Sequence, residues 1–386
     1  MDCLAYDSGR CRSCTLIETP YARQVASKQD TLERLLREAL GDAATSIEWQ
    51  PPMVGPESGF RTKAKMVVAG TVDQPTVGIL DADGHGVDLR DCPLYDPTLT
   101  AAFPALSRFV SVAGLQPYSV PERRGELKHI IVTTSPSGEL MARFVVRSTE
   151  PLARMRKHLA WLQGELPALT VVTVNVLPEH RAVMEGEREI VLTEQAELHM
   201  ALGTVDLRLR PQSFFQTNTD MARALYAHVA QWVAQSRPRT VWDLYCGVGG
   251  FALHCLARGR AVTGVESSEQ AVLSARDAAS DMAARGVAGA DEVRFVAADA
   301  TLWASAHDSP DVVIVNPPRR GIGADLARWL ESSRVPRVVY SSCNAVTLAR
   351  DLAAMPSLVP VEARLFDMFP QTAHFEAVVL LERAAR

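Results

Sequence analysis

The chain has 386 residues, of which 47% are apolar and 22% are charged, and its formal net charge is −5. This length exceeds one ordinary hydrophobic core and predicts two domains, while the acidic balance excludes a protein that coats nucleic acid through bulk positive charge. No apolar run approaches the roughly 20 residues of a membrane-spanning helix, and the first residues lack a secretion signal, so we expect a cytoplasmic protein that contacts no membrane.

Residues 1–19 are expected to form a short cysteine-bearing arm. Cys3, Cys11 and Cys14 have the spacing C-x7-C-x2-C, and Cys92, which precedes a proline, could add a fourth ligand from a distant loop. Four thiolates suit either an iron–sulfur cluster or a structural zinc ion, and the spacing does not separate the two. Four unrelated reduced thiols are the alternative, which the crowding of three cysteines into 14 residues disfavours.

Residues 20–210 are expected to form a central α+β domain. Apolar positions at helical spacing predict a helix at about residues 23–40. Short β-branched runs separated by turn residues follow, which is typical of an antiparallel sheet. Basic residues outnumber acidic ones between residues 120 and 158, but the charge alone favours an ordinary solvated surface. The expected strands are 64–71, 76–80, 129–134, 140–146, 171–177, 189–192 and 204–209.

Residues 211–386 are expected to form a second domain, because helical and strand patterns now alternate. Such alternation predicts a parallel sheet with crossover helices. The first helix is expected at residues 221–235. The expected strands are 240–244, 261–266, 293–297, 312–316, 338–342 and 377–381.

A glycine-rich turn follows the first strand of this second domain. Gly247 and Gly250 carry no Cβ, which lets the backbone approach a nucleotide-like ligand at the switch point of a parallel sheet. The next strand ends at Glu266, where a carboxylate can accept hydrogen bonds from two ribose hydroxyls. Dinucleotide-binding folds share both features, so together they indicate an adenosine site and leave the cofactor open.

The end of the fourth strand favours one cofactor. Asn316 is followed by two prolines and an arginine, and many methyltransferases carry Asn-Pro-Pro beside the sulfonium of S-adenosylmethionine. A simple strand-end turn before proline is the alternative explanation for Asn316. Arg319 and Arg320, which follow this element, are candidates for phosphate or base contacts.

Cys343 and Glu376 form the candidate catalytic pair. A thiol at a strand end is a candidate nucleophile and a carboxylate is a candidate base, although a lone cysteine is more often a buried structural residue. Carbon 5 of uracil is too weak a nucleophile to attack a methyl sulfonium unaided. A thiolate that adds to carbon 6 places electron density on carbon 5, and a base must later remove the carbon 5 proton. One cysteine and one carboxylate satisfy this scheme.

Several motifs, in the same order, resemble the signatures of the RNA uracil-C5 methyltransferases over the whole chain. The matching segments are 210–218 (RPQSFFQTN), 315–323 (VNPPRRGIG), 341–344 (SSCN) and 367–376 (DMFPQTAHFE). The resemblance implies that Cys343 is the nucleophile and Glu376 the base. It also implies a 4Fe-4S cluster on Cys3, Cys11, Cys14 and Cys92, and an S-adenosylmethionine site lined by Gln216, Tyr245, Gly247, Gly250, Glu266 and Asn316.

Within this family the chain resembles the branch that methylates uridine 747 of 23S ribosomal RNA, because the cysteines begin almost at residue 1 and no β-barrel RNA-binding module precedes them. The implied fold is a Rossmann-like methyltransferase domain preceded by an α+β RNA-facing domain and an iron–sulfur arm. We expect 23S ribosomal RNA as the partner and no obligate protein partner. The alternatives are a uridine of another ribosomal or transfer RNA, a nonenzymatic RNA-binding iron–sulfur protein and an NAD-dependent oxidoreductase.

Overall fold

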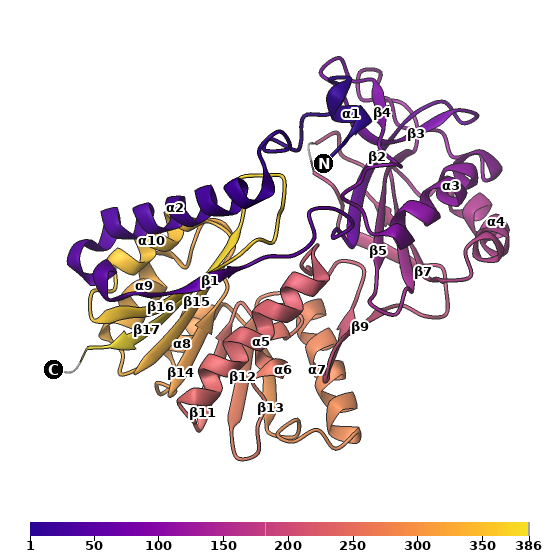
Figure 1. Ribbon diagram of the computed structural model, residues 1–386. Coiled ribbons are helices and arrows are strands. Elements are labelled where there is room, and N and C mark those ends of the chain that lie inside the picture. The colour runs from indigo at the N-terminus through magenta and orange to yellow at the C-terminus, as the bar shows by residue number, and fades with distance from the viewer. Residues whose placement is uncertain (182, 385–386) are drawn as a thin grey trace.

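Two β-sheets organise the chain in the computed structural model, which describes residues 1–181 and 183–384 (Figure 1). One sheet has eight strands and dominates the C-terminal half, and the other has seven strands and lies in the middle of the sequence. A separate hairpin consists of β9 (Leu198–Leu202) and β10 (Val205–Leu209). None of the described helices has the length and apolar character needed to cross a membrane.

The eight-stranded sheet confirms the expected parallel α/β architecture. Its order is β1-β16-β17-β15-β14-β11-β12-β13, and β17 alone runs antiparallel to its neighbours. The order of connection reverses between β11 and β14, which creates a switch point where ligands bind in open α/β sheets. The strands are β1 (Glu48–Met53), β11 (Thr240–Leu244), β12 (Ala261–Glu266), β13 (Val293–Ala297), β14 (Val312–Val315), β15 (Arg337–Ser342), β16 (Leu358–Phe366) and β17 (Glu376–Arg383).

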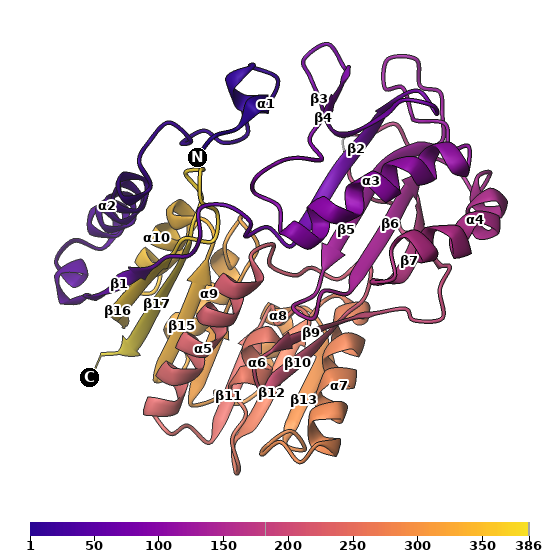
Figure 2. The same cartoon turned by 45° about the vertical axis from the view of Figure 1, so that its right-hand side comes forward.

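Helices cover both faces of this sheet (Figure 2). The two faces bury separate hydrophobic cores, as expected for strands that are apolar on both sides. One face packs against α5 (Thr219–Gln235), α6 (Gly250–His254), α7 (Glu269–Ala284) and the β9–β10 hairpin. The other packs against α2 (Tyr21–Leu40), α8 (Ala300–Ser305), α9 (Gly323–Ser332) and α10 (Ala345–Ala353).

The N-terminal segment belongs to this sheet, which differs from the expected domain boundaries. The sequence placed residues 20–210 in one central domain, but α2 packs on α10 and β1 pairs in parallel with β16. A short 3₁₀ helix, η1 (Gly41–Ser46), joins them. Leu32 and Leu36 of α2 are fully buried in the core of the C-terminal half. Helical periodicity shows that α2 has an apolar stripe, but it does not show which surface will bury that stripe.

The seven-stranded sheet forms the central domain proper. Its order is β4-β3-β2-β5-β6-β7-β8, and β6 and β7 are a parallel pair in an otherwise antiparallel sheet. Helices α3 (Pro97–Val112) and α4 (Leu152–Glu165) cover one face and bury Phe103, Phe109 and Phe144. The strands are β2 (Lys63–Gly70), β3 (Pro75–Leu80), β4 (Gly86–Asp88), β5 (Leu127–Thr134), β6 (Leu140–Val146), β7 (Leu169–Val176) and β8 (Arg188–Val191).

The basic stretch at residues 120–158 is partly internal. Arg143 is only 1% exposed and forms ion pairs with Glu185 and Glu189. Arg147 is paired with Glu126. The local excess of basic residues in the sequence therefore overstates the positive charge that this domain presents to a partner.

Candidate active site

A cavity of about 500 Å³ opens at the carboxyl ends of β11, β12, β14 and β15, beside the start of β17. It lies at the switch point of the eight-stranded sheet, where ligands are expected. The structure brings nearly all the predicted catalytic and cofactor-binding residues to this cavity, although they come from separate parts of the chain. The predicted residues that line it are Gln216, Tyr245, Gly247, Glu266, Asn316, Cys343 and Glu376.

Gly250 is the exception among the predicted catalytic and cofactor-binding residues, because it does not line the cavity. It begins α6, and a Cβ at this position would lie 2.5 Å from the ring of Tyr226. Glycine is therefore required at position 250 so that α6 can pack against Tyr226. Gly247 has open space around it and a φ of +54°, so it gives the turn a left-handed backbone at the cavity wall.

Glu266 ends β12 and closes the glycine-rich turn. Its Oε2 accepts a hydrogen bond of 3.2 Å from the Gly247 backbone N–H. Its Oε1 accepts bonds of 3.0 Å from the Ser267 hydroxyl and from the Ser268 N–H. A carboxylate offers about four acceptor positions, so Glu266 keeps capacity for a hydroxyl donor in the cavity.

Cys343 lies between the end of β15 and the start of α10, and it is half-buried. Asn344 caps α10 by accepting a bond from the Val346 N–H, and its Nδ2 donates to the Arg319 carbonyl at 2.9 Å. Burial, followed by the nearby Glu376, raises the pKa of the Cys343 thiol, while the Arg319 guanidinium beside it opposes that rise. The thiol therefore has a cationic neighbour that favours its reactive thiolate form.

Glu376 is the first residue of β17 and is 1% exposed. Its Oε1 accepts a 2.6 Å bond from the Ser341 hydroxyl and a 2.9 Å bond from Asn316 Nδ2. Burial raises the pKa of Glu376 to about 7, although both hydrogen bonds lower it. A carboxyl group with a pKa near neutral pH is well matched to general-base work.

Sequence reasoning assigned Asn316 to the cofactor site and gave Ser341 no role. The structure shows that both residues also hold the carboxyl group of Glu376, because β17 lies antiparallel beside β15 and aligns its first residues with Ser341 and Ser342. Ser341 stands two residues before Cys343 in the same motif, which was the available signal. The pairing of β15 with β17 could not be read from local pattern.

Several known proteins resemble this chain over most of its length. Residues 187–384 match the family described as tRNA (Uracil-5-)-methyltransferase. Proteins named 23S rRNA (uracil(747)-C(5))-methyltransferase RlmC, from Shigella sonnei and Escherichia coli O127:H6, are 48% identical over 99% of this chain and 99% of their own length. The crystal structure of Pyrococcus abyssi tRNA (uracil-54, C5)-methyltransferase with S-adenosyl-L-homocysteine matches with a TM-score of 0.75 and 26% identity, over 95% of this chain and 85% of that one.

The chain belongs to the RNA uracil-C5 methyltransferase family. It is an S-adenosylmethionine-dependent RNA methyltransferase, and the fold of its C-terminal half is the mixed α/β fold of such enzymes. The Pyrococcus structure was determined with S-adenosyl-L-homocysteine, which is the product form of this methyl donor. The cavity beside Cys343 is thus the candidate active site of a methyltransferase.

The four predicted ligand cysteines of this methyltransferase also meet in space. Cys3, Cys14 and Cys92 share an apolar cluster with Ile17 and Phe60. Burial, followed by the neighbouring thiols of Cys92, Cys11 and Cys3 in that order, raises the pKa of Cys14 to about 11. None of the four forms a disulfide within the described chain. Four free thiols in one place are a donor set that fits a soft metal site.

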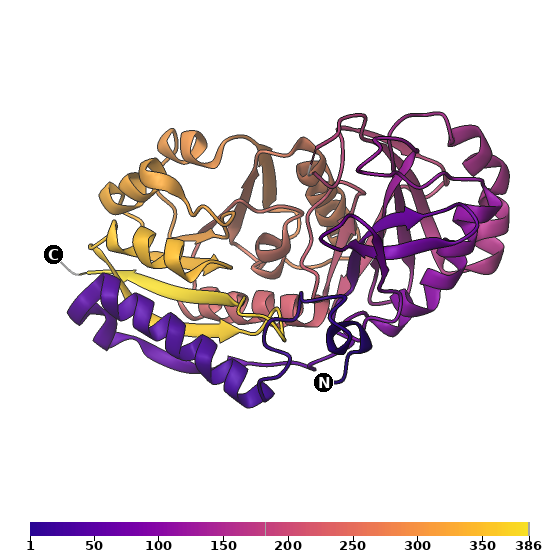
Figure 3. The same cartoon turned by 90° about the horizontal axis from the view of Figure 1, so that it is seen from above.

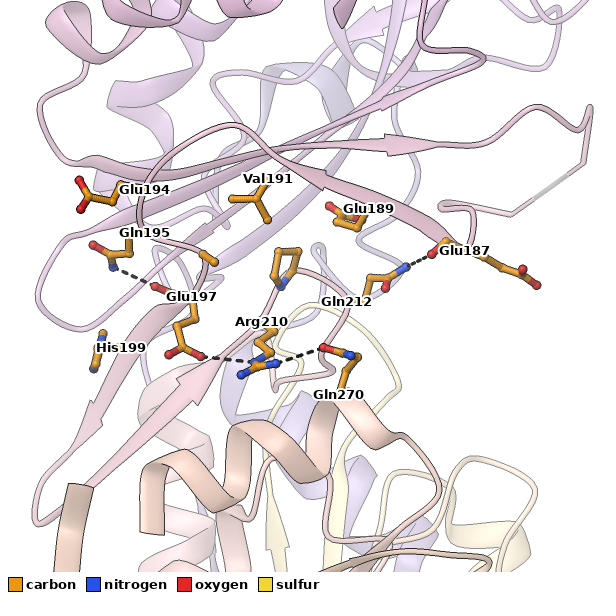
Figure 4. A pocket seen from close by; sticks show the side chains of 12 residues that line it. Glu187, Glu189, Val191, Glu194, Gln195, Glu197, His199, Arg210, Gln212 and Gln270 are labelled. Carbon is orange, nitrogen blue, oxygen red and sulfur yellow. Dashed lines mark hydrogen bonds and ion pairs between the residues drawn. The ribbon is translucent and has the colours of Figure 1, made fainter. Parts of the chain in front are cut away.

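A larger cavity, of about 750 Å³, lies between the central domain and α7 (Figure 4). Figure 4 shows Arg210 between Glu197 and Gln270, with Gln212 reaching back to the Glu187 backbone. These contacts join the two halves of the molecule. The residues that line this cavity include no cysteine and none of the predicted catalytic or cofactor-binding residues, so chemistry places the active site in the smaller cavity.

Two further cysteines have packing roles, and a histidine of the 367–376 motif forms no hydrogen bond with Glu376. Cys246 and Cys255 are buried, and burial raises the pKa of both thiols, so they are inert core residues. His374 is exposed, and its ring lies 6.5 Å from the ring of Phe369. Neither hydrogen bond of Glu376 involves His374, since these bonds come from Ser341 and Asn316.

Proposed function

We propose that this methyltransferase modifies carbon 5 of a uridine in 23S ribosomal RNA, that uridine 747 is its target, and that the reaction passes through a covalent adduct with Cys343. The observation that carries the proposal is the placement of Cys343 and Glu376 in one cavity with the predicted cofactor residues. The RNA target is supported by relatives at 48% identity whose names specify uracil 747 of 23S rRNA.

The proposed chemistry assigns a separate task to each side chain. Arg319 stabilises the Cys343 thiolate, whose sulfur adds to carbon 6 of the uracil ring and makes carbon 5 nucleophilic. S-adenosylmethionine, when bound, supplies the methyl group that carbon 5 takes. The ionised carboxyl of Glu376 then accepts the proton of carbon 5, the bond between carbon 6 and sulfur breaks, and the thiolate is released. Asn316 and Ser341 orient that carboxyl group.

The methyl donor is proposed to lie along Gln216, Tyr245, Gly247, Glu266 and Asn316. Glu266 would accept hydrogen bonds from ribose hydroxyls, because its carboxylate ends β12 at the cavity wall. The target uridine must leave its stack to reach Cys343, since a stacked base exposes neither carbon 5 nor carbon 6 to a side chain in a pocket. Arg319 and Arg320 are exposed at this cavity and can contact the RNA.

We also propose a 4Fe-4S cluster on Cys3, Cys11, Cys14 and Cys92, which would tie the arm at residues 1–19 to the central domain. Within the described chain, the one group of three or more potential ligand atoms that all lie within 4.8 Å of one another is Asp81, Asp83 and His85. The thiols are therefore spread more widely than the ~3.8 Å edge of a zinc–thiolate tetrahedron. Iron and sulfide analysis of anaerobically purified protein tests this proposal, and stoichiometric zinc without iron would overturn it.

The function is tested by mapping 5-methyluridine in 23S ribosomal RNA from cells with and without the gene. Loss of the modification at uridine 747 in the deletion strain, and its return with the wild-type gene, is the expected result. Transfer RNA from the same cells is the matched control, because the Pyrococcus relative is named for uracil 54 of tRNA. Loss of methylation in the transfer RNA, with 23S ribosomal RNA unchanged, would assign the enzyme to the other substrate.

The covalent step is tested with Cys343→Ala and Glu376→Gln. Cys343→Ala should abolish methyl transfer while S-adenosylmethionine still binds, because the sulfur is needed for addition to carbon 6. Glu376→Gln should accumulate a protein–RNA adduct, because the carbon 5 proton is no longer removed. Denaturing gels with labelled RNA, together with equilibrium binding of the methyl donor, measure both effects. Turnover by Cys343→Ala at the wild-type rate would exclude the covalent route.

A further inference from the structure

The segment at residues 367–375 links β16 to β17 and leads directly into Glu376. The N-terminal segment runs beside residues 367–375. The two segments meet near the junction of the central domain and the C-terminal half (Figure 3). The segment has no regular secondary structure apart from turns, so its own backbone does not fix its shape. Strand pairing holds β17 from Glu376 onward, so contacts from elsewhere must set the shape of the segment that leads into it.

An ion pair fixes the start of this segment. Lys28 Nζ donates to Asp367 Oδ1 at 2.6 Å and to the Phe369 carbonyl at 3.1 Å. Lys28 is 3% exposed and Asp367 is fully buried. A buried charge without its partner is costly, so Asp367 is strongly constrained to remain next to α2.

A pair of amides fixes the middle of the segment. The Gln371 N–H donates to Gln24 Oε1 at 3.0 Å, and Gln24 Nε2 donates back to Gln371 Oε1 at 2.9 Å. Gln371 is fully buried and has a φ of +67°, a left-handed conformation that is rare outside glycine. Such a conformation persists only where the surroundings impose it. Gln24 therefore helps to impose it.

The cysteine arm, residues 1–19, contributes a third contact to this segment, at Gln371. The Leu16 N–H donates to the Gln371 carbonyl at 3.0 Å, and Leu16 lies two residues after Cys14. Gln24 Nε2 also donates to the Leu16 carbonyl at 3.0 Å. The arm, α2 and the segment before Glu376 thus share one hydrogen-bond network.

We propose that Gln24 and Lys28 are positioning residues for proton abstraction: through Gln371 and Asp367 they fix residues 367–375 and so place the carboxyl group of Glu376. We call these four residues, Gln24, Lys28, Asp367 and Gln371, the α2 clamp. The proposal rests on the proposed role of Glu376 as the base. Cys343 is fixed independently, by β15 and by the contact of Asn344 with Arg319, so the α2 clamp should affect the base step and spare thiolate addition.

The two steps can be measured separately with two versions of one RNA. The first is a transcript of the 23S ribosomal RNA segment that contains uridine 747, and the second carries 5-fluorouridine there. Fluorine cannot leave carbon 5 as a cation, so the fluorinated RNA reports addition and methyl transfer and stops at the adduct. The normal RNA additionally requires loss of the carbon 5 proton to Glu376.

Gln24→Met should slow release of methylated normal RNA by about tenfold to a hundredfold, the range expected when a catalytic group is displaced by about 1 Å. A methylated protein–RNA adduct should accumulate, while the fluorinated RNA should form its adduct at a rate within about threefold of wild type. Gln29→Met is the matched control, because Gln29 lies on the same helix and its side chain donates to Glu33 within that helix. Lys28→Arg, which can keep the ion pair, should be less impaired than Lys28→Met.

Equal slowing of both RNAs by Gln24→Met, or slowing of neither, would overturn the positioning role. If Gln24→Met does not fold, Gln371→Gly supplies the same test, since glycine adopts a φ of +67° without strain while the side-chain contact to Gln24 is lost. Glu376→Gln separates the proposed role of Glu376 from the proposed role of the α2 clamp. If Glu376→Gln accumulates no adduct, the assignment of Glu376 as the base is wrong. If Glu376→Gln accumulates the adduct but the α2 clamp variants do not, only the positioning role of the clamp is wrong.

Discussion

Glu376 is held in a setting where burial and hydrogen bonding act in opposite directions on its charge. Burial disfavours the ionised form, and the bonds from Ser341 and Asn316 favour it. The result, a pKa of about 7, keeps a large fraction of both protonation forms present at neutral pH. If Glu376 is the proposed base, this balance lets it accept a proton in one turnover and lose it before the next.

The raised pKa of Glu376 predicts a pH-dependent stability. Between about pH 4.5, the usual value, and pH 7, the folded carboxyl holds a proton that the unfolded chain has released. The free energy of unfolding should therefore fall as the pH rises through this window, by up to about 3 kcal/mol from this group, and then level off. Glu376→Gln should remove that part of the decline in urea titrations at several pH values.

Asp243 has a similarly raised pKa, of about 8, so only the difference between wild type and Glu376→Gln isolates Glu376. Parallel stability curves for the two proteins would contradict the prediction.

The charge of Arg319 is expected to affect the pKa of the Cys343 thiol. Its guanidinium lowers the pKa of a thiol that burial raises, so Arg319→Met should raise that pKa and reduce the thiolate fraction at neutral pH. If the thiol pKa rises by about one, adduct formation with 5-fluorouridine RNA should fall by about tenfold at pH 7 and recover at higher pH. Arg320→Met controls for the loss of an arginine at the cavity, because Arg319 and not Arg320 acts on the Cys343 pKa, so any loss it causes should not recover at higher pH. A loss that alkaline pH does not restore would point to RNA contact as the role of Arg319.

The glycine-rich turn after β11 needs glycine for two different reasons. Gly247 supplies a left-handed backbone at the cavity, and Gly250 makes room for Tyr226 against α6. Gly250→Ala should therefore destabilise the fold by about 1–3 kcal/mol, because its Cβ would overlap a buried ring. Denaturant unfolding measures this effect.

Gly164 in α4 is the matched control for Gly250, since nothing lies within 4 Å of a Cβ there. Gly164→Ala should stabilise the protein by about 0.4–1 kcal/mol, because alanine restricts the unfolded chain. Gly250→Ala with wild-type stability would show that the Tyr226 ring can move aside.

The strands that carry the proposed cofactor site could be predicted closely from the sequence. β11, β12 and β13 have the expected bounds, because buried parallel strands are short apolar runs between turn signals. β1 and β16 escaped prediction, and both contain proline, which normally argues against a strand. β1 tolerates Pro51 and Pro52 because it is an edge strand, and β16 has an irregular register next to Pro360.

The residues of the candidate site could be predicted from the sequence, but the contacts between them could not. Motifs located Cys343, Glu266 and Glu376, because each stands at one end of a strand whose pattern is clear. The contacts of Asn316 with Glu376 and of Gln24 with Gln371 join residues 60 and 347 positions apart. Such contacts depend on strand order and helix docking, which no local pattern encodes.

At the scale of the whole molecule, the C-terminal half depends on residues far from it in sequence. A fragment of residues 211–386 would lack α2, β1 and the β9–β10 hairpin, and would expose core residues such as Leu348 on α10. We expect this fragment to aggregate or to lack a cooperative unfolding transition. Residues 54–192, which hold the complete seven-stranded sheet and its own core, should fold alone. Circular dichroism melts of both fragments test the prediction, and a cooperative melt of fragment 211–386 would contradict it.

The pairing of β1 with β16 also sets an order of events on the translating ribosome. β1 ends at Met53 and its partner strand ends at Phe366, so the first strand is made long before the sheet edge that receives it. At about 5–20 residues per second the delay is roughly 15–60 s. During that interval the apolar stripe of α2 and the open edge of β1 have no native partner, while the central domain is synthesised and completed. Nascent chains of this enzyme should therefore be bound by holdase chaperones through their first 53 residues until synthesis has almost ended.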